Sequence, residues 1–146
     1  MTVTGGCLCK AIRYELDAPP LTSRICWCHV CQQIGSSNGT VNACFSSDAL
    51  RISGPLSDYS YVADSGTIMH CRFCAFCGVH IFITAESRPH LVFMRASSLD
   101  NPEVARPLSN IWVSQAPSWA VFDERLPKLE GQPAPIVVSP SNAASM

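Results

Sequence analysis

Nine cysteines, eight of them in three short clusters, constrain this sequence more than any other feature. The clusters are a C-x-C pair, a C-x-C-x2-C group and a C-x2-C-x2-C group, formed by Cys7 and Cys9, by Cys26, Cys28 and Cys31, and by Cys71, Cys74 and Cys77. An odd number of cysteines at these spacings argues against a disulfide framework and favours metal binding or redox chemistry in a reducing compartment. Cys44 stands alone, and we interpret it as a small buried apolar residue.

The run FCAFCG, residues 73–78, is typical of a zinc knuckle. A C-x2-C loop places two sulfurs about 3.5–4 Å apart around one ion, as tetrahedral zinc requires. The glycine that follows lets the loop turn with a positive φ. This knuckle supplies only two ligands, and the C-x-C pair near the N-terminus has the same deficit. The two motifs therefore predict one closed structural zinc site, formed by Cys7, Cys9, Cys74 and Cys77.

The run ICWCHVCQQ, residues 25–33, places three cysteines within six positions and lacks a fourth. Three protein ligands with an open fourth position is the pattern of catalytic zinc sites. The spacing leaves three interpretations open: an open zinc site, a site closed by a fourth protein ligand, and a set of redox-active thiols. The candidates for a closing ligand are Cys71, His29, His70 and His80.

Short apolar segments bounded by turn residues predict a mainly β chain. With 146 residues, 47% of them hydrophobic and 14% charged, the chain is long enough for one globular domain. Strands are expected within 11–16, 40–45, 50–54, 58–66, 79–85, 90–96 and 110–114, with 79–85 and 90–96 forming a hairpin. One helical turn is expected within 97–107, capped by Asp100 or Asn101. From residue 132 the sequence is rich in proline and small residues, which predicts a domain over 1–131 and a flexible tail over 132–146.

The charge pattern and the missing motifs exclude several function classes from the expectations. The formal net charge is -1 and the ten basic residues are scattered, so nucleic acid is not an expected partner. No apolar run approaches the ~20 residues that span a bilayer, and the first residues lack the pattern of a secretory signal. We therefore expect a cytoplasmic protein without a membrane partner. No G-x-G-x-x-G, P-loop, G-x-S-x-G or H-E-x-x-H pattern occurs, so nucleotide cofactors and these hydrolases lose support.

The ordered segments GGCLCKAIRYEL, CWCHVC, RFCAFCGVHIFI and NIWVSQAPSW…LPKLEG resemble the glutathione-dependent formaldehyde-activating enzyme family, which includes the domain of centromere protein V. The resemblance covers roughly residues 4–131. It implies a single zinc-stabilised, β-tent-like domain of mostly antiparallel strands. It also implies two zinc ions per chain, a structural one held by Cys7, Cys9, Cys74 and Cys77 and a catalytic one held by Cys26, Cys28 and Cys31.

The activity that the resemblance implies is that of a carbon–sulfur lyase, which reversibly joins glutathione to formaldehyde as S-hydroxymethylglutathione. Trp27, Gln32 and Gln33 adjoin the three-cysteine motif and are candidate substrate-binding residues. Histidine is common in the family at the position of Trp27, and basic residues at the positions of both glutamines. These departures make a less acidic, more apolar thiol–aldehyde adduct an alternative substrate. Two other classes stay open, a non-catalytic zinc-stabilised binding module and a thiol redox protein, and the sequence indicates no oligomeric state.

Overall fold

The structure is a computed structural model that describes residues 1–137, so the end of the predicted tail, 138–146, lies outside the described residues. Short strands follow one another along most of the described chain, with one short α-helix and four 3-10 turns. The strands are β1 (Val3–Gly6), β2 (Arg13–Leu16), β3 (Thr22–Cys26), β4 (Thr40–Ser46), β5 (Leu50–Ser53), β6 (Leu56–Val62), β7 (Ile68–Cys74), β8 (His80–Ala85), β9 (Leu91–Arg95) and β10 (Ser109–Ile111). The helix α1 is His29–Ile34, and the 3-10 turns are η1 (Ser47–Ala49), η2 (Ala96–Ser98), η3 (Pro102–Ala105) and η4 (Val113–Gln115).

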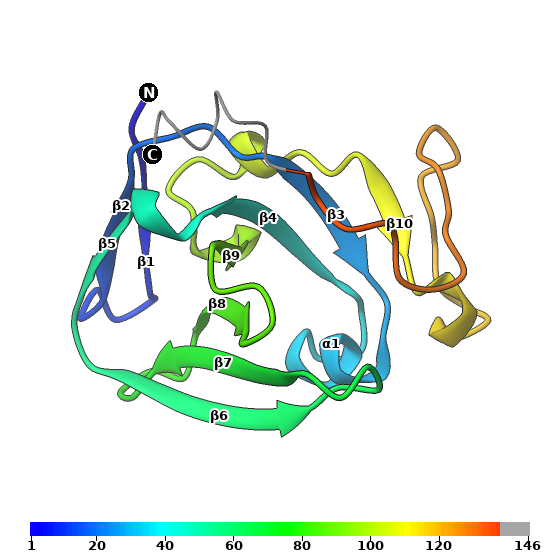
Figure 1. The fold of residues 1–146 in the computed structure, drawn as a ribbon, viewed down its shortest axis with the longest axis horizontal. Helices are drawn as coiled ribbons and strands as arrows, with labels where there is room; N and C mark the ends of the chain where they lie inside the picture. The colour runs from blue at the N-terminus through cyan, green and yellow to red at the C-terminus, as the bar shows by residue number, and fades with distance from the viewer. Residues whose placement is uncertain (138–146) are drawn as a thin grey trace.

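The strands form two sheets, in the orders β1-β2-β5 and β10-β3-β4-β9-β8-β7-β6. Every pairing within the sheets is antiparallel except that of β10 with β3. Figure 1 shows the larger sheet curling round, so that β6 and β7 lie opposite β4, with α1 at the end of β3 inside the curl. The expected mainly β, mostly antiparallel fold is confirmed.

The two sheets are held together by one apolar core. The smaller sheet buries the alternate residues of its strands, as in β2, where Tyr14 and Leu16 are buried and Arg13 and Glu15 are exposed. From the larger sheet Phe45 is fully buried in the same cluster. Burial of a side chain of that size contributes roughly 2–3 kcal/mol. This core fixes the positions of the loops that carry the cysteines.

Several predicted elements are confirmed. The hairpin over 79–85 and 90–96 is β8 paired with β9, and the expected helical turn is η3, where the Asn101 side chain accepts a hydrogen bond from the Glu103 amide at 3.2 Å. Three strands were not predicted, β1, β3 and β7, although β3 and β7 each end at a cysteine of the clusters. No helix within residues 1–137 is long and apolar enough to cross a membrane.

Candidate metal centres

Two groups of cysteine sulfurs converge in the described chain. Within each group every pair of sulfurs lies within 4.8 Å. The first, here the four-cysteine cluster, is Cys7, Cys9, Cys74 and Cys77; the second, the three-cysteine cluster, is Cys26, Cys28 and Cys31. Each group can hold a metal ion. These are the seven cysteines that the sequence assigns to two zinc sites, and the binding of zinc at either group stays a prediction.

The four-cysteine cluster joins two connections that are far apart in the sequence. One pair of its cysteines lies between β1 and β2, and the other lies at the end of β7 and in the turn before β8. The Sγ atom of Cys9 lies 3.6 Å from that of Cys7 and 3.7 Å from that of Cys74. Four thiolates around a tetrahedral zinc, with zinc–sulfur bonds of about 2.3 Å, are about 3.8 Å apart. The spacing of these sulfurs fits zinc.

Backbone amides are directed at the sulfurs of this cluster. The amide of Ile12 donates to Cys7 Sγ at 3.3 Å, and the amides of Phe76 and Cys77 donate to Cys74 Sγ at 3.3 and 3.4 Å. The turn that makes this possible passes through Gly78, which has φ +77°. Donors placed round a sulfur favour its thiolate, the form that binds metals.

The electrostatics of the four-cysteine cluster agree with that geometry. Amide hydrogen bonds from the backbone at Cys9 and Val79 lower the pKa of Cys77 to about 6. Burial raises the pKa of Cys7, but the Ile12 amide and the neighbouring thiols outweigh it, so the net pKa of Cys7 is lowered. At Cys9 the Ala11 amide lowers the pKa, but burial and hydrogen bonds with the other three thiols outweigh it and raise the pKa to about 11. The surroundings therefore favour the thiolate form at Cys7 and Cys77.

The three-cysteine cluster is local, because its members come from the end of β3 and the first turn of α1. Cys28 is the N-cap of α1, and its sulfur accepts a hydrogen bond from the Cys31 amide at 3.4 Å. Cys26 and Cys31 are buried, whereas Cys28 is partly exposed. Hydrogen bonds from the thiols of Cys26 and Cys28 lower the pKa of Cys31 to about 2. The same three sulfurs suit a soft divalent metal such as zinc, with Cys28 on the accessible side.

None of the four candidate closing ligands joins the three-cysteine cluster in the part of the chain that the structure describes. His29 is exposed, and the two ring nitrogens of His70 contact Asp58 at 3.2 Å and Glu86 at 2.7 Å. The ring of His80 stacks on that of Phe73, with the centroids 5.2 Å apart. Cys71 is buried on β7 outside the cluster. The geometry therefore leaves this cluster with three protein ligands.

An apolar wall lines the three-cysteine cluster on the side of β10. Ile111 is the ladder partner of Cys26, and Trp112 and Leu129 pack against the same small cluster. Trp112 has a left-handed backbone, φ 59° and ψ 34°, and its indole nitrogen donates to Gln132 Oε1 at 3.0 Å. A left-handed tryptophan is uncommon and persists only where surrounding contacts hold it.

The three candidate substrate-binding residues have different surroundings. Trp27 is 4% exposed, and its indole nitrogen donates to Asn110 Oδ1 at 3.1 Å. Gln32 donates to the carbonyl oxygens of Trp27 and Gln115 at 2.6 and 2.9 Å, which ties α1 to the segment after β10. Gln33 is exposed on α1. Their part in substrate binding stays a prediction.

The structure also brings residues to the site that the sequence did not single out. Thr40 is the ladder partner of Cys26 across β3 and β4, and Arg95 of β9 donates to the Thr40 hydroxyl at 3.1 Å. Arg95 is only 3% exposed. A sequence signal for these residues is lacking, because threonine and arginine at strand ends are most often exposed.

The lone cysteine behaves as predicted. Cys44 is fully buried on β4, and burial raises the pKa of its thiol to about 12. All nine cysteines lie in the described residues, and none forms a disulfide.

Comparisons with known proteins found a matching family and a similar solved structure. The model of a family described as glutathione-dependent formaldehyde-activating enzyme matches residues 2–115, a span that includes both cysteine clusters. The crystal structure of a Rhodobacter sphaeroides protein superposes with a TM-score of 0.55 at 18% identity, covering 86% of this chain and 98% of that one. That likeness shows a shared fold. No curated protein matches the sequence. With its family match over most of its length, the chain belongs to the glutathione-dependent formaldehyde-activating enzyme family.

Proposed function

We propose that this protein is a zinc-dependent carbon–sulfur lyase that acts on a thiol–aldehyde adduct such as S-hydroxymethylglutathione. One observation carries the proposal: Cys26, Cys28 and Cys31 converge without a fourth protein ligand in the described residues. A site of three ligands leaves one position for a substrate, whereas a structural site is closed by four. The family match supports a thiol and an aldehyde as the class of substrate, because the description of the family names glutathione and formaldehyde.

Under this proposal the chain holds two zinc ions with different tasks. The four-cysteine cluster would hold a structural zinc, and the three-cysteine cluster a catalytic one. Zinc at the three-cysteine cluster would supply a positive charge that favours the thiolate form of a substrate thiol at neutral pH. A cytoplasmic location agrees with cysteines that form no disulfide.

The reaction itself is an addition and its reverse. The substrate thiolate attacks the aldehyde carbon and a carbon–sulfur bond forms, while the carbonyl π electrons move to oxygen, which takes a proton from water. In reverse, the adduct hydroxyl gives up its proton, the carbonyl re-forms and the carbon–sulfur bond breaks with its electrons on sulfur. Both directions need a thiolate, because the thiol is the weaker nucleophile and the poorer leaving group.

The protein residues position the reactants and shield them from water. Cys28, the partly exposed member of the cluster, marks the side from which a substrate enters. Ile111, Trp112 and Leu129 form the apolar side of the site and exclude water from it. Gln32 keeps α1, and with it Cys31, fixed against the segment that follows β10. Gln32 and Gln33 are neutral where the family commonly has basic residues, which favours an adduct with fewer carboxylates than that of glutathione.

The first test counts the metal and measures the exchange. Native mass spectrometry is expected to show two zinc ions per chain, and exchange NMR is expected to show faster interconversion of formaldehyde and S-hydroxymethylglutathione with protein present. Cys28→Ala should retain one zinc and lose the acceleration. Cys44→Ala, which removes a buried thiol outside both clusters, should keep two zinc ions and the full acceleration.

Other outcomes would favour the other classes. Two zinc ions without any acceleration, for glutathione or for an apolar thiol, would favour a zinc-stabilised binding module. A single zinc ion, with a reversible disulfide among Cys26, Cys28 and Cys31, would favour a thiol redox protein.

A further inference from the structure

Arg95, the last residue of β9, carries a buried positive charge without a carboxylate partner. It is 3% exposed, and none of the ion pairs formed within residues 1–137 includes it. A guanidinium out of water is costly unless an anion or a full set of hydrogen bonds compensates it. The structure must therefore provide Arg95 with an anionic neighbour of another kind.

One end of the Arg95 guanidinium is fixed and the other is free. Its Nη1 atom donates to Asn42 Oδ1 at 2.6 Å and to Thr40 Oγ1 at 3.1 Å. Its Nε and Nη2 atoms are buried and have no hydrogen-bond partner. These two nitrogens lie along one edge of the planar group, the edge with which arginine grips anions.

The strand register aims this guanidinium towards the three-cysteine cluster. Asn42 is the ladder partner of Arg95, and Thr40, two residues earlier on β4, is the partner of Cys26. Residues two apart on a strand share a face of the sheet, so Arg95, Thr40 and Cys26 lie on the same face. The Nη1 bond to Thr40 thus extends from β9 towards the end of β4 that borders Cys26.

Sulfurs lie on both sides of Arg95 on this face of the sheet. Cys71 of β7 is the ladder partner of Ile83, and Ile83 is the partner of Phe93, two residues before Arg95. Thiol hydrogen bonds from Cys26 and Cys28 account for most of the low pKa of Cys31, and the positive charge of Arg95 adds to it. Burial raises the pKa of Cys71, and the charge of Arg95 opposes that rise. The strand order places Arg95 of β9 between Cys26 of β3, a member of the three-cysteine cluster, and the buried Cys71 of β7.

The net charge of the zinc-loaded three-cysteine site explains why a positive charge is needed beside it. Three thiolates exceed the double charge of a zinc ion by one negative charge, so the loaded site would repel a further anion. The single charge of Arg95 cancels that excess. A fourth ligand that is a thiolate then enters a neutral site rather than a negative one.

We propose that Arg95 is the counter-charge of the three-cysteine site and makes its fourth ligand position select a thiolate over a neutral ligand. The inference rests on the proposed function only in requiring that this site binds a divalent metal and accepts a thiol. Arg95 acts through its charge and not by touching the reacting atoms, so it is a positioning residue.

The test uses the full chain loaded with Co²⁺, whose absorption reports the ligands of the metal. 2-Mercaptoethanol serves as the thiol probe because it has no carboxylate, and imidazole serves as the neutral probe. The central variant is Asn42→Asp, which puts a carboxylate against Arg95 Nη1 and neutralises the charge with no change in side-chain size. Arg95→Gln and Arg95→Lys complete the series, and Arg88→Gln, an arginine that stacks on Phe93 instead, is the control.

The wild-type protein is expected to bind both probes. Asn42→Asp and Arg95→Gln should weaken 2-mercaptoethanol binding about tenfold or more, the effect of one charge at short range in a partly shielded site. Both variants should leave imidazole binding unchanged. Arg95→Lys should keep most of the thiol affinity, and Arg88→Gln should change neither.

Three results would overturn the inference. An equal loss of affinity for both probes would give Arg95 a purely structural role. An unchanged affinity of Asn42→Asp for 2-mercaptoethanol would show that the charge of Arg95 does not act on thiol binding. A wild-type site that binds imidazole and no thiol would overturn this inference and the lyase together. Selective loss of thiol binding in a protein that does not accelerate the exchange would support Arg95 as counter-charge and reject the lyase.

Discussion

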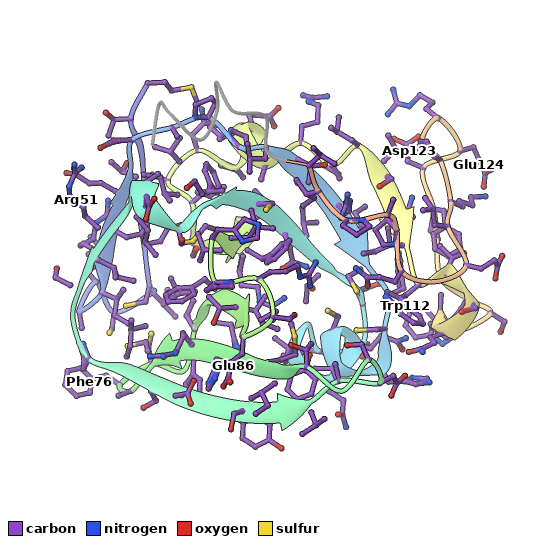
Figure 2. All side chains as sticks on the ribbon, in the orientation of Figure 1. Arg51, Phe76, Glu86, Trp112, Asp123 and Glu124 are labelled. Carbon is purple, nitrogen blue, oxygen red and sulfur yellow. The ribbon has the colours of Figure 1, made fainter. Side chains whose placement is uncertain are left out.

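The two cysteine clusters hold similar ligands in opposite ways. The four-cysteine cluster joins residues 65 positions apart and links a connection of the smaller sheet to one of the larger. Two of its members, Cys7 and Cys74, belong to the main apolar core. The three-cysteine cluster joins residues of one short segment and packs in a small cluster of its own. Figure 2 shows the separation, with Phe76 of the four-cysteine loop on the opposite side of the molecule from Trp112. A metal at the four-cysteine cluster would therefore cross-link the two sheets. A metal at the three-cysteine cluster would bind to a fold that forms without it.

Removing one ligand from each cluster should give the largest contrast. Cys74→Ala removes a ligand 1% exposed in the core, and it should cost several kcal/mol of the roughly 5–15 kcal/mol that stabilise a domain. Cys28→Ala removes a partly exposed ligand and the cap of α1, at a cost of about 1 kcal/mol. Thermal unfolding followed by circular dichroism, with native mass spectrometry for the metal count, measures both.

The control for this pair is Cys44→Ala, which removes a fully buried thiol that belongs to neither cluster. Its stability shows how much of the cost comes from lost packing of a buried thiol and how much from the loss of a metal ligand. If Cys28→Ala unfolded the chain as readily as Cys74→Ala, both sites would be structural, and the division of tasks would be wrong.

The sequence predicted the membership of both clusters because metal spacing is a local property. Each two-cysteine motif lacked two ligands, and only the other motif supplied them. Whether the second site is closed depends instead on tertiary structure: His70 lies between two carboxylates, and Cys71 lies on a neighbouring strand. Arg95 could not be found from sequence, since its burial and its bonds come from β4, more than fifty residues earlier.

The missed strands have a related cause. β3, with the sequence TSRIC, lacks apolar–polar alternation, and its pairing with β4 places two of its polar residues in partly buried positions. The sequence of β7, IMHCRFC, indicates a cysteine motif rather than a strand, yet β7 pairs with β6 on one side and with β8 on the other. In both cases the ladder partners, and not local preference, form the strand. The hairpin of β8 and β9 was predicted because its strands are rich in β-branched and aromatic residues.

Substitution of two glycines, one beside each cluster, should separate the two metal sites with smaller losses of stability than substitution of a buried ligand. A Cβ at Gly39 would lie 2.6 Å from the Cys26 carbonyl oxygen and 3.1 Å from Trp27 Cδ2. Gly39→Ala must therefore shift the backbone at Cys26, and it should lose the second metal at a cost of about 1–3 kcal/mol. Gly78→Ala meets no atom within 4 Å and pays only for its φ of +77°, about 1 kcal/mol.

The measurement is the metal count of the folded protein together with its midpoint of chemical unfolding. Gly39→Ala is expected to keep one metal and Gly78→Ala to keep two. Retention of both metals in Gly39→Ala would show that the three-cysteine cluster tolerates movement of Cys26 and is less rigidly held than the structure indicates.

The smallest expected effect lies on β7 outside both clusters, at His70. Hydrogen bonds with Glu86 and Asp58 raise the pKa of His70 above its ordinary value of 6.5. Protonated His70 therefore stabilises the folded chain fully below about pH 6.5, and that contribution disappears as the pH rises through the folded-state pKa. His70→Gln should lower stability in urea slightly at pH 5.5 and not at pH 8.5, because the site is exposed to solvent. His90→Gln, a histidine outside the ion pairs of the described residues, is the control. A loss that is equal at both pH values would mean that His70 acts through packing, and a loss of metal would mean that it belongs to a cluster after all.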